Sequence, residues 1–119
     1  MTEEIVARVV LFVVMGATGV MLIWMARAAA SGRLRRNGFV GIRTPSTMTS
    51  DEAWLAAHRR AERPTQVAGV VSLVVALIAI LPVSENVLVG GVLAGSVVVL
   101  AIVIHGAVVG GRAAREVEG

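Results

Sequence analysis

The stretch that decides the fold is IVARVVLFVVMGATGVMLIWMARAAA, residues 5–30, in which Arg8 and Arg27 are the only charged residues. About 18 residues separate the two arginines, close to the roughly 20 that a helix needs to cross a hydrocarbon core about 30 Å thick. A secretory signal peptide is the competing interpretation. It is disfavoured because Glu3 and Glu4 stand where a basic cluster is expected, and because the run exceeds the usual ~7–15 apolar residues. We therefore expect a permanent membrane-spanning helix.

Two further apolar runs follow the first. Residues 67–83 (VAGVVSLVVALIAILPV) form the shorter run, and residues 87–109 (VLVGGVLAGSVVVLAIVIHGAVV) form a run long enough to span a bilayer. Both are rich in Val and Ile, which favour strands in water. In lipid, however, a lone strand would leave its backbone groups without hydrogen-bond partners. The sequence therefore predicts an all-α integral membrane protein with three transmembrane helices, forming one membrane domain over residues 1–119.

The composition of the chain agrees with a membrane protein. Of its 119 residues, 56% are hydrophobic and 16% are charged, whereas about a quarter of a soluble domain is charged. The absence of Cys excludes disulfides and thiolate metal sites. All basic residues are Arg and the pI is about 11.3, a value that suggests nucleic-acid binding in a soluble protein. In a membrane protein the same excess marks the cytoplasmic side.

The positions of the arginines predict the orientation. Eight lie between Ala26 and Pro64, the connection at residues 84–86 has none, and Arg112 and Arg115 follow the third run. The positive-inside rule then places the loop of residues 31–66 and the C-terminus in the cytoplasm, and the N-terminus outside. Three spans, an odd number, place the two termini on opposite sides of the membrane, as this orientation requires. We expect a multi-pass protein of the plasma membrane.

The loop begins with a basic turn, SGRLRRNG, at residues 31–38. Its arginines are expected to pair with the phosphates of anionic lipids, at about 1 kcal/mol each. A protein contact is the alternative interpretation. Nucleic-acid binding is not expected, because Phe39 is the only aromatic residue nearby and no helix-turn-helix pattern is present.

The second half of the loop predicts a short amphipathic helix over about residues 50–63. Thr49 as the N-cap and Glu52 three residues later form a capping box. We expect this helix to lie along the inner membrane surface with Trp54 at the acyl boundary. Pro64 is then expected to break or redirect the chain into the second span.

The sequence predicts no catalytic, metal or cofactor site, and we do not expect an enzyme. Asp51 and Glu52 are explained by helix capping, and His58 has no second His or Cys nearby. His105 lies within the third run, where an ionisable residue suggests a function. Because it lies about two turns before Arg112, we interpret it as an interfacial or packing residue.

Gly91 and Gly95 form a GxxxG step in the third run. Such a step lets two helix backbones approach closely. Packing inside the chain and packing between copies in an oligomer are both open interpretations of these helix-packing residues.

The loop resembles the signature of the SdpI family, N-x-x-x-G-x-R-T-P, a polar spacer and then W-x-x-x-H-R. The resemblance covers roughly residues 36–81, and its motifs are specific in combination rather than singly. It identifies a partner-binding or structural loop with eight motif residues: Asn37, Gly41, Arg43, Thr44, Pro45, Trp54, His58 and Arg59.

The founding members of that family are membrane proteins that give immunity to a secreted toxin and sequester a cytoplasmic repressor when toxin is bound. For this chain, a short form, the resemblance implies immunity to, or sensing of, a membrane-active peptide toxin. The alternative is a small accessory subunit of a larger membrane complex, in contact through its glycine-rich third helix. The outer segments, residues 1–4 and 84–86, are small, so we expect a toxin to be met within the bilayer.

Overall fold

The computed structural model describes residues 2–118, and over this range all its regular structure is helical. The helices are α1 (Glu3–Ala30), α2 (Asp51–Ile80) and α3 (Glu85–Glu118). Each is long enough and apolar enough to cross a membrane. The prediction of an all-α protein is therefore confirmed for the described residues, and its three helices have the length and composition of membrane spans.

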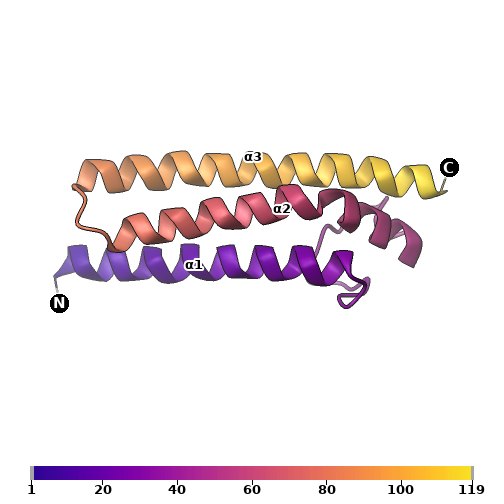
Figure 1. Ribbon diagram of the computed structural model, residues 1–119, viewed down its shortest axis with the longest axis horizontal. Coiled ribbons are helices and arrows are strands. Elements are labelled where there is room, and N and C mark those ends of the chain that lie inside the picture. Colours follow the sequence, from indigo (N-terminus) through magenta and orange to yellow (C-terminus); the bar gives the residue numbers. More distant parts are fainter. Residues whose placement is uncertain (1, 119) are drawn as a thin grey trace.

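Helix α2 lies between α1 and α3 and packs against both (Figure 1). The N-terminus and the turn between α2 and α3 lie at one end of the molecule, and the C-terminus and the loop of residues 31–50 lie at the other. The longest dimension of the molecule is 55 Å. The loop and the turn are thus separated by the full length of the three helices.

Small residues allow the helices to approach closely. A Cβ atom added at Gly19 of α1 would lie 2.7 Å from the backbone oxygen of Gly69 of α2, so the two backbones are in contact. The Ser72 hydroxyl donates a hydrogen bond of 2.7 Å to the Met15 carbonyl across the same interface. Packing of small residues and interhelical hydrogen bonds are the usual means of helix association in lipid, where burial of apolar surface between helices adds little.

The GxxxG step of α3 packs against α2 of the same chain. Gly91 faces the side chain of Ile78 on α2, and Gly95 lies directly against the side chain of Val75. Farther along α3, a Cβ atom added at Gly110 would lie 3.0 Å from the Ala57 carbonyl oxygen. One face of α3 is therefore fitted to α2 along much of its length.

The predicted interfacial helix is not a separate element. Residues 51–80 form one continuous helix with Pro64 inside it, and the axis of α2 bends along its length (Figure 1). A proline inside a helix removes one backbone hydrogen bond and usually kinks the helix. The N-cap is Ser50 rather than Thr49, because the Ser50 hydroxyl accepts the Ala53 N–H at 3.0 Å. The Thr49 hydroxyl instead donates to the Ser46 carbonyl at 2.9 Å.

Candidate functional site

The loop of residues 31–50 connects the end of α1 to the start of α2 at the end of the molecule that carries the C-terminus (Figure 1). Seven of the eight motif residues form a hydrogen bond or a close contact within this loop, between the loop and α2, or between α2 and the end of α1. Pro45 is exposed and opens the turn of residues 45–48. We call this assembly the motif loop.

Asn37 organises the first turn of the motif loop. Its side-chain oxygen accepts the backbone N–H groups of Phe39 and Val40, each at 2.9 Å. Its side-chain nitrogen donates to the carbonyls of Arg35 at 2.8 Å and Val40 at 3.1 Å. An asparagine amide offers two donors and one oxygen with two lone pairs, so Asn37 is fully used within the turn.

Gly41, Trp54 and His58 form the centre of the motif loop. Gly41 has a φ of +116°, in the left-handed region that favours glycine. A Cβ atom added there would overlap the Trp54 ring and lie 3.0 Å from His58 Nε2. The rings of Trp54 and His58 are 4.2 Å apart between centroids, and both residues are only 2% exposed. The backbone of the loop is therefore packed directly onto the two rings of α2.

His58 joins the loop to α2 through both of its ring nitrogens. Nε2 accepts the Ile42 N–H at 2.9 Å, so Nδ1 is the protonated nitrogen and donates to the Trp54 carbonyl at 2.8 Å. His58 lies before the predicted span of residues 67–83. Burial lowers the pKa of its imidazole, and the hydrogen bond to the Trp54 carbonyl partly opposes the shift. The neutral ring is the form that can make both bonds.

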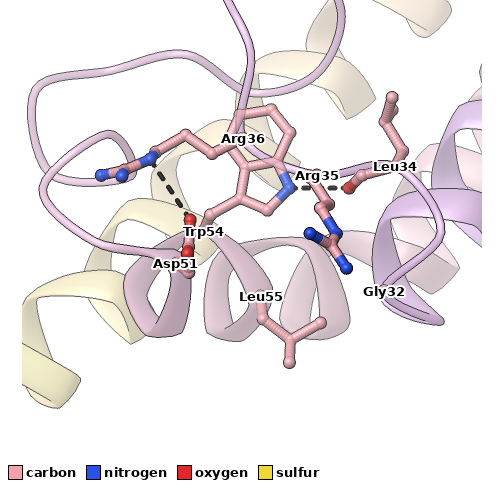
Figure 2. Close-up of a pocket in the computed structure, with 7 residues that line it drawn as sticks. All are labelled: Gly32, Leu34, Arg35, Arg36, Asp51, Trp54 and Leu55. Atoms are coloured by element: carbon pink, nitrogen blue, oxygen red, sulfur yellow. Dashed lines mark hydrogen bonds and ion pairs between the residues drawn. The ribbon is translucent and has the colours of Figure 1, made fainter.

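Trp54 is packed inside the protein rather than at the acyl boundary, which corrects the prediction made from its amphipathic pattern. Its indole N–H donates to the Leu34 carbonyl at 3.0 Å, as Figure 2 shows. A cavity of about 190 Å³ beside it is lined by Arg35 and Arg36 among others. Arg36 reaches the Met48 carbonyl at 2.9 Å and Asp51 at 3.4 Å. The predicted pairing of these arginines with lipid phosphates stays a prediction.

Thr47 is a buried residue of the motif loop that the sequence analysis did not identify. Its hydroxyl accepts the Thr44 N–H at 2.9 Å and donates to the Ile42 carbonyl at 2.6 Å. Thr44 completes this pair by accepting the Thr47 N–H at 3.3 Å. Among the several Ser and Thr residues of 44–50, no local pattern distinguishes the one that faces inward.

Arginines hold the loop and the helix ends beside it in place. Arg59 Nε donates to the Ala30 carbonyl at 3.3 Å, where a cation suits the negative end of α1. Arg43 Nη1 donates to the Gly38 carbonyl at 2.8 Å within the loop. Arg115 of α3 approaches the Ser46 hydroxyl at 3.4 Å. The loop is thus joined to all three helices, most firmly to α1 and α2.

The polar side chains at the centre of the motif loop serve its own structure. The polar atoms of Asn37, His58 and Trp54 are taken up by backbone partners. No cluster of three or more His, Asp or Glu side chains able to hold a metal ion is found among residues 2–117. His105 is exposed on α3. Outward, the motif loop exposes arginine side chains and the ring of Phe39.

Arg8 is the second important residue that the sequence analysis left without a role. Its guanidinium donates to the carbonyls of Ala79, Leu81 and Val83, at 3.3, 3.1 and 2.7 Å, and lies 3.4 Å from Glu4. It therefore ties the start of α1 to the end of α2. The available signal was an arginine inside an otherwise apolar run, a position that usually has a specific partner.

A groove lies beside Arg8, between the first turns of α1 and α3. Its volume is about 500 Å³, and its walls include Leu11 of α1 and Leu88 and Val92 of α3. Three carboxylates also line it: Glu3, Glu4 and Glu85. We call it the acidic groove.

Comparison with known proteins agrees with the signature in the motif loop. A model of the SdpI/YfhL protein family matches residues 33–110, well over half of the chain, including all of α2 and most of α3. No curated protein and no solved structure gives a significant match. The family match confirms the resemblance drawn from residues 37–59.

Proposed function

The chain belongs to the SdpI/YfhL protein family, and on this premise we propose that it is a non-enzymatic membrane protein that gives resistance to, or senses, a membrane-active peptide. The observation that carries the proposal is the family match over the motif loop and two of the three apolar helices. The motif residues support a binding or signalling role, because their polar groups hold the loop in one shape.

We propose that the peptide binds in the acidic groove. It combines apolar walls with carboxylates at the ends of α1 and α3. A peptide with an apolar body and a cationic end would bury its body between the helices and place its charge near these carboxylates. The groove runs between membrane-spanning helices, so this contact needs no large domain outside the bilayer.

We further propose that the acidic groove faces outward and the motif loop faces the cytoplasm. Ten of the eleven arginines lie in the motif loop or in the halves of the helices nearest to it, and only Arg8 lies in the other half of a helix. The positive-inside rule favours this orientation. Reporter fusions test it: a periplasm-active reporter working at the C-terminus, or a cytoplasmic one working at Glu85, contradicts the proposal.

The function is tested by deleting the gene and challenging cells with a panel of membrane-active peptides. Wild type should restore survival, and Val92→Trp, which fills the acidic groove, should not. Val97→Trp is the matched control, because Val97 is exposed on α3 and does not line the groove. Arg43→Ala tests the motif loop in the same cells, with immunoblots to show equal amounts of protein. Unchanged sensitivity on deletion would overturn the proposal.

The accessory-subunit alternative is tested by purification from native membranes. Gly91 and Gly95, the contact face suggested for that role, pack against α2 within the chain. A subunit contact would therefore use another face of α3. Stable co-purification with a larger membrane complex, together with unchanged peptide sensitivity, would favour the subunit role over resistance.

A further inference from the structure

A second groove lies between α1 and α3 at the opposite end of the molecule from the acidic groove. Its volume is about 450 Å³, and its walls are formed by Met21 and Met25 of α1 and by Val103 and Ala107 of α3. Residues 39–44 of the motif loop also line it. Its volume lies within the ~300–1,000 Å³ typical of ligand pockets. We call it the loop groove.

Two exposed side chains of the motif loop line this groove. Phe39 is 89% exposed, an unusual position for a large aromatic residue. Arg43 is exposed and uses Nη1 for the bond to the Gly38 carbonyl. A guanidinium has five N–H donors in a planar fork. Among residues 2–117 its remaining donors have no protein partner, so they are available to an anion.

The loop groove therefore requires a ligand with an apolar chain and an anionic end. An inorganic phosphate would leave the apolar walls uncovered, and a neutral hydrocarbon would leave the guanidinium without a partner. In a membrane protein, anionic phospholipid has both parts at the right depth, with acyl chains beside the helices and phosphate at the level of the loop.

We propose that the loop groove binds an acyl chain of one anionic phospholipid, with the phosphate held by Arg43 and Phe39 inserted in the same leaflet. The bound lipid would then be a specific ligand of the motif loop and not only part of the surrounding membrane. The site does not depend on the resistance role, because it rests on the groove and on the membrane location alone.

The test is native mass spectrometry of the full chain from micelles holding equal amounts of phosphatidylglycerol and phosphatidylcholine. Wild type should retain one lipid, with about a fivefold preference for phosphatidylglycerol, the effect of one arginine at an anionic surface. Arg43→Gln should lose that preference. Arg33→Gln, on the same loop but outside the groove, should keep it. An unchanged preference in Arg43→Gln overturns the proposal.

A second pair of variants tests the groove independently of Arg43. Val103→Trp fills it and should abolish retention of either lipid, whereas Val97→Trp, outside the groove, should retain lipid as wild type does. Retention by Val103→Trp would overturn the proposal. A dimer that forms without lipid in wild type and is lost in Val103→Trp would also overturn it, by assigning the groove to a second copy of the chain.

Discussion

Gly41→Ala should release the motif loop from α2, because Gly41 has a φ of +116° and lies against the Trp54 ring. A new Cβ would overlap Trp54 and lie 3.0 Å from His58 Nε2. The left-handed φ costs alanine about 1–3 kcal/mol, and overpacking costs about 1–3 kcal/mol more. The total, about 2–6 kcal/mol, is a large part of the ~5–15 kcal/mol that stabilises a whole domain. Release of the loop is the expected way to relieve this strain.

Two other glycines of the same loop separate the two causes. Gly32 has a φ of +87° and nothing within 4 Å of an added Cβ, so Gly32→Ala should lose only the conformational part, about 1–3 kcal/mol. Gly38 also has open space around it, and its φ is not in the left-handed region. Gly38→Ala should therefore change stability by less than about 0.5 kcal/mol.

The assay is equilibrium unfolding by dodecyl sulfate in mixed micelles, followed by tryptophan fluorescence. In a Trp24→Phe background, Trp54 is the one remaining tryptophan and reports on the loop. Release of the buried indole shifts its emission to longer wavelength. If Gly41→Ala changes stability as little as Gly38→Ala does, both the conformational and the steric part of the reasoning are refuted. If it matches Gly32→Ala, the steric part is refuted and the conformational part stands.

Three further predictions concern single side chains. Because burial lowers the pKa of His58 in the folded chain, the stability of the loop should fall as the pH drops below about 6.5, and His58→Gln should remove this dependence of the Trp54 signal. Asn37→Ala leaves two backbone N–H groups without their acceptor, so loop stability should fall by about 1–3 kcal/mol and amide exchange at Val40 should quicken. Arg8→Gln removes a cation from three carbonyls at the end of α2 and should lower unfolding stability by about 1.5–3 kcal/mol. Arg27→Gln, the control at the other end of α1, should change it little.

The three spans could be predicted from sequence because an unbroken apolar run in lipid has one solution, a helix. The start of the second helix could not be predicted in the same way. Pro64 is a local signal for a break, but α2 is buried on both sides of it, at Ala61 and Ala68, and this packing holds one continuous helix. Tertiary contacts therefore override the local preference.

The motif residues could be identified from the sequence, but the directions in which their side chains point could not. A tryptophan on the apolar side of a helix has the same spacing whether it faces lipid or protein, and Trp54 faces the loop because Gly41 and the Leu34 carbonyl cover it. The two grooves between α1 and α3 depend on the order of the helices in space. That order places α2 in the middle, and no local sequence pattern specifies it.

The central position of α2 sets the order in which the molecule can be built during synthesis. Helix α1 leaves the ribosome first, but the carbonyls of Ala30 and Leu34 meet Arg59 and Trp54 only after α2 has been made. Helix α3 is made last and packs against α2. The hairpin of α1, motif loop and α2 can therefore form its contacts before α3 leaves the ribosome, and α3 then joins a partner that is already folded.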